Sequence, residues 1–352
     1  MIDRRIFLRL TGGIAAGAAG LAVSAPAEAD AIAAPPGAPP SFVRVGRGVA
    51  SPLVDPLRLL SDRLALASGG RLHLEALSGA NGSPSAPNSS VVLASEEEFA
   101  ADEPTSLLLA GYPMGPSARE LDITMWLRGA GGQGLWDMAA ARRGWKPLLV
   151  SMMGGAEAHL WSRVQLDGPR DLTGMRIAAS RVLDAPLEAL DAVPVRADDV
   201  LAAFEAGAIG AFETDDPAVT LAASEQFGDR ARWYAGNLAG TSRVISLRIP
   251  LAQWQSLSSA DQALTEAVAQ ETATTLEAIR RTHGRMLTNQ IAEARQQRPA
   301  SVPAQIRDAL AREAQQLLPQ SVRDEPLFAS MLATMRALVA APMDNGGERP
   351  LA

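Results

Sequence analysis

The sequence predicts an α/β protein with two lobes and one long helix that spans them. Three observations support this prediction. Short apolar segments alternate with amphipathic segments of helical spacing, a pattern typical of largely parallel sheets. The chain of 352 residues is long enough for two domains of ordinary size. One amphipathic segment runs for about thirty residues or more, or about 45 Å at roughly 1.5 Å per residue, which exceeds what one lobe needs. A helix of this length could brace two lobes, although periodicity alone equally allows a core helix of one large domain.

The N-terminal segment has the three parts of an export signal, namely a basic start, an apolar middle and an A-E-A end at 27–29. The pair Arg4 and Arg5 and the weakly hydrophobic middle match the twin-arginine type. We therefore expect a cleaved twin-arginine signal peptide over 1–29, with an uncleaved anchor as the alternative. A Pro/Ala linker is expected over 30–41.

Composition narrows the function classes. The chain has no cysteine, which excludes disulfides and thiolate metal sites. Removing the signal, with its three arginines and two acids, leaves 29 basic and 37 acidic residues, a net charge of -8. This acidic balance argues against nucleic-acid binding. No later segment approaches 18 uninterrupted apolar residues, so we expect an exported protein that is not embedded in a membrane.

Periodicity locates the main elements in order along the chain. The expected strands are 72–77, 106–110, 148–153, 175–179, 209–213 and 244–247. A helix over 52–68 presents leucines on one face and ends at Gly69-Gly70. The long helix begins near Ser258, where Ser259 and Gln262 have the spacing of a capping box. A frayed tail is expected over 344–352.

Two irregular segments are interpreted as structural features without a chemical role. Residues 78–90 form a polar, turn-rich loop. The acidic stretch SEEEFAADE over 95–103 could cap a short helix, and a solvated face is the favoured interpretation. The stretch RGAGGQG over 128–134 contains G-x-G-x-x-G, the spacing of a dinucleotide-binding turn. Helical spacing precedes it and no acidic residue follows at the ribose distance, so a glycine turn between two helices is the favoured interpretation.

Few residues suggest catalysis. The three histidines lack metal-ligand spacing, and no G-x-S-x-G elbow exists. The acids Glu213, Asp215 and Asp216 could form a hydrolytic pair or bind a hard cation through oxygen atoms. Arg176 lies in the apolar strand GMRIAAS, where a buried guanidinium needs an anionic partner. That partner is either an acid of the chain, such as Asp184 or Glu213, or a ligand.

Five stretches follow one another in the order found in one known family. They are SGGRLHLEAL (68–77), GYPMGPSARELDITMWLRGAGGQGLWD (111–137), DLTGMRIAAS (171–180), ALDAVPVRADDVLAAFEAGAIGAFE (189–213) and PLAQWQSLSSADQAL (250–264). Together they resemble the solute-binding proteins of tripartite ATP-independent periplasmic (TRAP) transporters, in particular the branch that binds 2-oxo acids and related monocarboxylates. The resemblance covers roughly residues 42–300.

The resemblance implies a periplasmic, non-enzymatic protein whose two lobes close over a small organic carboxylate and deliver it to TRAP membrane permease subunits. It implies one lobe of 42–148 plus about 241–275, and a second of 149–240 plus about 276–343. It assigns Arg176 as the clamp of the ligand carboxylate, because a planar guanidinium donates two parallel N–H groups. The oxo-acid branch also includes homodimers.

The resemblance further implies a cation, sodium or calcium, beside the ligand, although no cofactor is required. Glu157 and Glu213 match positions that hold it, Thr214 replaces a tryptophan at the ligand, and Asp215 follows. We therefore predict Arg176, Glu157 and Thr214 as ligand contacts, and Glu157, Glu213 and Asp215 as metal ligands.

The chain also departs from the family. Between Leu77 and Leu107 a family helix is deleted, and Val91 and Val92 replace the aromatic residues that line the pocket. Two other functions stay open. One is an oxidoreductase exported by the twin-arginine route, which the export signal and the glycine turn at 129–134 allow. The other is a sensor or interaction protein that kept the fold and lost the ligand.

Overall fold

The computed structural model describes residues 41–45, 55–76, 91–113 and 120–340. The predicted signal peptide, most of the linker, the loop over 78–90 and the tail lie outside these residues. Within the described part of the chain, no helix is both long and apolar enough to cross a membrane.

The first sheet is antiparallel and has the strand order β3-β10-β4. Its strands are β3 (Val92–Ser95), β4 (Trp145–Gly154) and β10 (Ser242–Pro250). The strands predicted at 148–153 and 244–247 are thus confirmed. Their expected parallel pairing is wrong here, because β10 runs antiparallel to both neighbours. This arrangement brings a late segment of the chain between two early ones.

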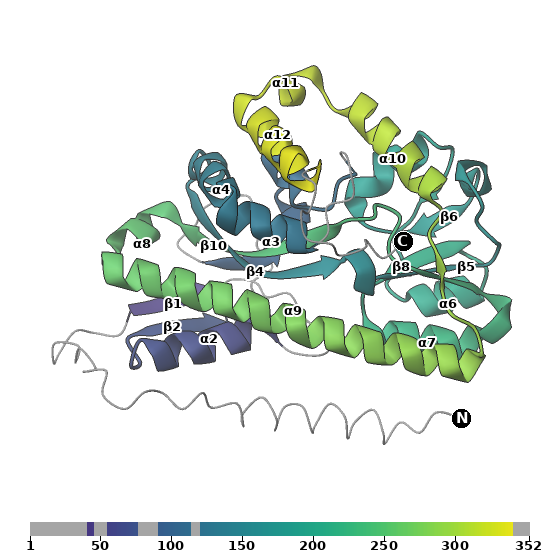
Figure 1. The fold of residues 1–352 in the computed structure, drawn as a ribbon, viewed down its shortest axis with the longest axis horizontal. Helices are drawn as coiled ribbons and strands as arrows, with labels where there is room; N and C mark the ends of the chain where they lie inside the picture. Colours follow the sequence, from purple (N-terminus) through teal and green to yellow (C-terminus); the bar gives the residue numbers. More distant parts are fainter. Residues whose placement is uncertain (1–40, 46–54, 77–90, 114–119, 341–352) are drawn as a thin grey trace.

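Helices cover both faces of this sheet (Figure 1). The covering helices are α2 (Pro56–Ala67), α3 (Glu120–Gly129), α4 (Gly132–Ala141), α8 (Leu251–Ser256) and α12 (Pro326–Ala340). One face packs on α2 and on β2 (Leu72–Ala76), which pairs in parallel with β1 (Ser41–Val45), and the other packs on α3, α4 and α12. The predicted assignment of 276–343 to the second lobe is therefore wrong for α12.

The second sheet is mixed and has the order β11-β9-β5-β8-β6-β7. Its strands are β5 (His159–Ser162), β6 (Arg176–Ala178), β7 (Val193–Pro194), β8 (Ala211–Thr214), β9 (Arg232–Ala235) and β11 (Ala300–Ser301). The helices that accompany it are α5 (Asp184–Glu188), α6 (Val200–Glu205), α7 (Pro217–Phe227) and α10 (Ala304–Leu317). The short helix α11 (Gln320–Arg323) lies beside α12 instead, and its Val322 packs on the first-sheet core. The α5 and α10 helices cover one face, and α6 and α7 cover the other.

The predicted long helix is α9 (Ser259–Arg295), which has 37 residues and is about 55 Å long at 1.5 Å per residue. It passes along both sheets (Figure 1). Leu276 lies in the core of the first sheet, and Ile291 lies in a core of the second. The N-cap is Ser258, whose hydroxyl accepts a hydrogen bond from the amide of Asp261, so the capping pair predicted one residue later is wrong.

The glycine turn at RGAGGQG joins two helices, as the favoured interpretation predicted. Gly131 has φ of 78°, which suits glycine, and separates α3 from α4. A β-carbon on Gly132 would lie 2.4 Å from Cδ2 of Trp126, so only glycine fits without displacing the buried indole. These glycines allow close helix packing, and no strand leads into them.

One predicted strand is wrong. Residues 104–108 form a 3-10 helix, η2 (Pro104–Leu108), in place of a strand over 106–110. Proline occupies the first turn of this helix, where its missing N–H has no helical partner to lose.

Candidate functional site

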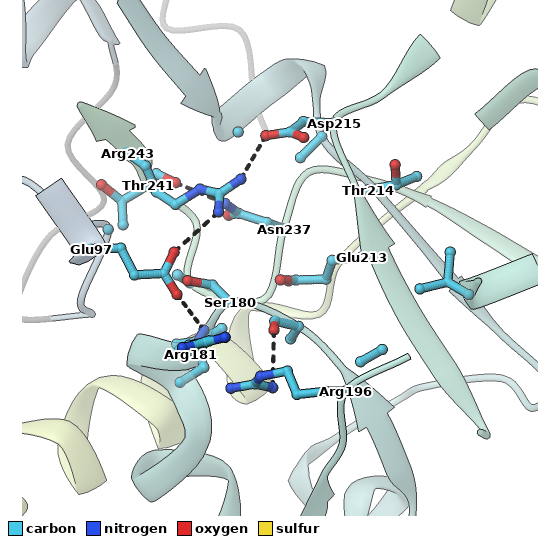
Figure 2. A pocket seen from close by; sticks show the side chains of 18 of the residues that line it. Glu97, Ser180, Arg181, Arg196, Glu213, Thr214, Asp215, Asn237, Thr241 and Arg243 are labelled. Carbon is cyan, nitrogen blue, oxygen red and sulfur yellow. Dashed lines mark hydrogen bonds and ion pairs between the residues drawn. The ribbon is translucent and has the colours of Figure 1, made fainter. Parts of the chain in front are cut away.

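A cavity of about 290 Å³ lies between the two sheets. Its polar lining comes from both of them (Figure 2). Glu97, Thr241 and Arg243 belong to the first-sheet side, whereas the rest end or follow strands of the second sheet. These second-sheet residues are Ser180, Arg181, Arg196, Glu213, Thr214, Asp215 and Asn237. Aromatic side chains are absent from the described lining residues, so hydrogen bonds and charge would dominate recognition.

Strand β8 delivers three of the predicted residues to this cavity. Glu213 and Thr214 end the strand, and Asp215 follows before α7 begins. The Thr214 hydroxyl accepts a hydrogen bond from the amide of Asp216 at 3.1 Å, and the carboxylate of Asp216 then caps α7. These contacts fix the turn and hold Asp215 at the cavity. The prediction that Thr214 contacts the ligand remains a prediction.

Arg243 joins acids from the two sides of the cavity. Its guanidinium lies 3.2 Å from Oε2 of Glu97 and 2.7 Å from Oδ2 of Asp215. Burial alone would lower the pKa of Arg243, but Asp215 and Glu97 outweigh that effect and raise it. The amide of Arg181 also donates to Glu97, at 2.6 Å. Glu97 therefore bonds to both sides of the cavity.

Glu213 is the most perturbed acid in the cavity. Burial raises its pKa to about 7, although the hydrogen bond from the amide of Leu238 and the charge of Arg243 oppose that rise. Near neutral pH this carboxyl group can therefore exist as a neutral acid or as an anion. A neutral carboxyl group can donate a hydrogen bond to a ligand oxygen.

Two further arginines line the cavity from loops that follow β6 and β7. Arg181 starts a short 3-10 helix, η5 (Arg181–Leu183), and its side chain is exposed. Arg196 is also exposed and pairs with Asp184. Nearby, Ser180 Oγ and Asn237 Oδ1 are buried without a hydrogen-bond partner in the described structure. The cavity thus combines cationic groups with unused polar atoms.

The structure does not place Arg176 in the cavity. The side chain of Arg176 is exposed at the start of β6, whereas Ala178 and Ser180, at the other end of this segment, line the cavity. The prediction of a buried guanidinium is therefore wrong. Its two suggested partners are engaged elsewhere, because Asp184 pairs with Arg196 and Glu213 accepts from the amide of Leu238.

Glu157 also lies apart from the cavity lining. It follows β4 in a 3-10 helix, η3 (Gly155–Glu157), and faces the side of α9, where its Oε2 lies 3.8 Å from Arg280. Arg280 pairs more closely with Glu120 at the start of α3. Burial, followed by the nearby charge of Glu120, raises the pKa of Glu157 to about 7, against the opposing effect of Arg280. This acid therefore belongs to a contact between α3 and α9.

The predicted cation ligands consequently do not form one set. Glu213 and Asp215 line the cavity, whereas Glu157 does not. Among the described residues, no group of three or more His, Cys, Asp or Glu side chains could hold a metal ion. Asp215 is already paired with Arg243, so the donors present do not fit a site of three carboxylates.

The acidic segment 95–103 contradicts its interpretation as a solvated face. Glu96 and Glu103 are 0% and 5% exposed, and both pair with Arg248 of β10, which is fully buried. Ser106 and Ser246 also hydrogen-bond to Glu96. Sequence reasoning missed this network and the neighbouring Glu97. The available signal was an arginine inside each half of the apolar strand β10, opposite a run of acids.

The valines predicted to replace a pocket wall have another role. Val91 is fully buried in the core between α2 and the first sheet, and β3 begins at Val92. Neither residue is among those that line the cavity.

Comparisons with known proteins give the fold. The chain matches no protein-family model and no curated protein by sequence. Solved structures match over most of its length. The chain has the two-lobe fold of TRAP periplasmic solute-binding proteins.

Three of the matching structures hold a bound carboxylate together with a metal ion. A TRAP solute-binding protein from Colwellia psychrerythraea, with bound calcium and pyruvate, has a TM-score of 0.70 at 16% identity, covering 85% of this chain and 94% of that one. A TRAP solute-binding protein from Pseudoalteromonas atlantica, with bound sodium and pyruvate, has a TM-score of 0.67 at 15% identity. The match covers 85% of this chain and 93% of that one. A TRAP solute-binding protein from Bordetella bronchiseptica, with calcium and picolinate in one site, has a TM-score of 0.66 at 19% identity. The match covers 86% of this chain and 92% of that one.

Proposed function

We propose that this protein is an extracytoplasmic solute-binding protein that captures a small organic carboxylate between its lobes and delivers it to a TRAP membrane permease. The observation that carries the proposal is the interlobe cavity with three arginines in its lining. The fold supports it, since the three matched structures are of solute-binding proteins, each with a carboxylate ligand. The sequence features of an export signal support a location outside the cytoplasm.

The ligand carboxylate would bind Arg181 and Arg196. Both side chains line the cavity; Arg196 pairs with one acid, Asp184, whereas Arg243 is already paired with two. A guanidinium binds a carboxylate through parallel N–H groups, and this geometry gives both strength and orientation. Arg176 lies outside the cavity lining, so we move the proposed clamp from Arg176 to these two residues.

The remaining polar groups would select the rest of the ligand. Ser180 Oγ and Asn237 Oδ1 lack partners. A keto or hydroxyl oxygen of a bound ligand would accept from the Ser180 hydroxyl, and a hydroxyl or amino group would donate to Asn237 Oδ1. The cavity volume of about 290 Å³ lies at the low end of the range for small-molecule pockets. We therefore propose a small, polar monocarboxylate such as a 2-oxo or 2-hydroxy acid.

The test is a thermal-shift and calorimetric panel on the mature protein with pyruvate, lactate, picolinate and succinate. At least one small monocarboxylate should raise the melting temperature of the wild type. The double variant Arg181→Ala/Arg196→Ala should lose the shift, with affinity falling about tenfold or more, as expected for loss of charged hydrogen bonds. The matched control is Arg176→Ala, which removes an arginine of the same lobe outside the cavity. Loss of binding in the control but not in the double variant would restore Arg176 as the clamp. Silence of the wild type across the panel would contradict carboxylate capture.

A further inference from the structure

Arg243 lies where acidic side chains from both sides of the cavity come together. Glu97 approaches it from the first sheet and Asp215 from the second, each through one carboxylate oxygen. Glu213 is near enough for its pKa to be lowered by Arg243 and raised by Asp215. The side chains of Arg243, Glu97 and Asp215 are 26%, 13% and 17% exposed, so water screens these charges only partly.

A metal ion and a guanidinium can each offset the negative charge of nearby carboxylates, but they contact them with different geometries. A hard cation gathers carboxylate and carbonyl oxygens around one point. A guanidinium carries one positive charge over a plane and donates hydrogen bonds to separate carboxylates. Here the two acids already receive N–H groups from Arg243, and Figure 2 shows the guanidinium between them.

We propose that the guanidinium of Arg243 takes the place of a metal ion in this cavity, so that this chain binds its ligand without calcium or sodium. The inference rests on the proposed function for its reference to a ligand. The chain would differ in this from the matched proteins of Colwellia psychrerythraea and Pseudoalteromonas atlantica, whose structures hold calcium and sodium beside pyruvate. Arg243 acts here as a positioning residue, because it holds the acids of both lobes against the cavity.

The charge balance makes the proposal specific. With Arg243 in place, one cation offsets Glu97 and Asp215, and a divalent ion entering between them would meet its positive charge. Without Arg243, Glu97, Asp215 and Glu213 would face one cavity with no cation between the first two. That set of oxygen atoms is of the kind that attracts calcium.

The experiment titrates calcium alone, and separately sodium alone, into metal-free mature protein, with the melting temperature and calorimetric heat as readouts. The wild type should show no saturable shift up to about millimolar calcium, the weak end of protein calcium sites. Arg243→Met, which keeps an unbranched apolar side chain, should gain a calcium-dependent rise in melting temperature. Arg176→Met is the matched control and should gain none. A cooperative melting curve establishes that each variant is folded.

Two results would overturn the proposal. One is saturable calcium or sodium binding by the wild type that Asp215→Asn removes, a test that needs no Arg243 variant. The other is a folded Arg243→Met protein that gains no calcium response. Neither readout contains an organic ligand, so a failed carboxylate panel and a failed metal prediction are distinguishable.

Discussion

Two arginines of β10 each form ion pairs with two acids, but one group of charges lies in the core of a lobe and the other lies at the cavity. Arg248 is fully buried and pairs with Glu96 and Glu103, whereas Arg243, five residues earlier, is partly exposed and pairs with Glu97 and Asp215. The first network is closed within one lobe. The second reaches across to the other lobe and borders a cavity.

The difference lies in where each network ends. Every partner of Arg248 comes from the first sheet or the segment over 95–106, so the network cannot change without unfolding that lobe. Arg243 has a partner beyond β8, which belongs to the second sheet. An ion pair between lobes can break when the lobes separate. The adjacent acids Glu96 and Glu97 therefore differ in role, since Glu96 stabilises the core of one lobe and Glu97 borders the cavity.

The largest effect should come from breaking the closed network. Arg248→Met would leave two buried carboxylates without their cation, and removal of one partner from a buried ion pair costs about 3–5 kcal/mol. Chemical denaturation should show this loss in the free energy of unfolding. The triple variant with Glu96→Gln and Glu103→Gln should recover part of it, because no buried charge is then left unpaired. A loss below about 1 kcal/mol would show that the comparison between the networks is wrong.

A smaller effect should come from the contact between α3 and α9, which is buried but incompletely paired. Glu157 has a pKa of about 7, raised from 4.5 by burial and by Glu120, so the folded protein binds a proton there that the unfolded chain has lost. Its contribution to stability is therefore full below pH 4.5 and lost as pH rises through 7. Glu157→Gln should flatten this decline and raise the melting temperature at pH 8 relative to the wild type, by roughly 2–6 °C for a gain of about 1–2 kcal/mol.

The control for that prediction is Asp171→Asn, a partly exposed acid in the 3-10 helix (Pro169–Leu172) that follows β5. Hydrogen bonds from the amides of Asp167 and Gly168 lower the pKa of Asp171, so its carboxyl group is more easily ionised in the folded protein. Asp171→Asn should therefore not reproduce the gain in melting temperature at pH 8. Melting curves between pH 4.5 and 8.5 compare the three proteins. A Glu157→Gln variant with the same pH slope as the wild type would exclude Glu157 as the titrating group.

The sequence was informative about elements and much less so about which charges meet. Hydrophobic periodicity located α9, β4, β10 and the glycine turn, because these features depend on local spacing. It located Glu213 and Asp215 at a strand end that proved to border the cavity. It could not show that β10 crosses between β3 and β4, since its partners lie about 150 positions away in β3 and about 90–105 positions away in β4. The arginine–acid pairs depend on that crossing, so they were missed.

Arg176 illustrates the same limit at one residue. A guanidinium in an apolar strand predicted burial, but β6 has only three residues, and its first position is exposed at the strand's start. Ile177 and Ala178 enter the cores on the two faces of the sheet. Strand periodicity describes the faces of a sheet and gives no information about how soon the strand emerges at an edge.

The smallest effect should come from a substitution of Arg176. This variant tests whether an exposed arginine contributes less to stability and binding than the two arginines of β10. Arg176→Ala should change the melting temperature by no more than roughly 1 °C, because an exposed side chain away from buried networks contributes little to stability. Calorimetry with a carboxylate that the wild type binds should give an unchanged dissociation constant. A tenfold loss of affinity in this variant would place the ligand near the start of β6 in the bound state, and the cavity between the lobes would then no longer explain anion capture by Arg181 and Arg196.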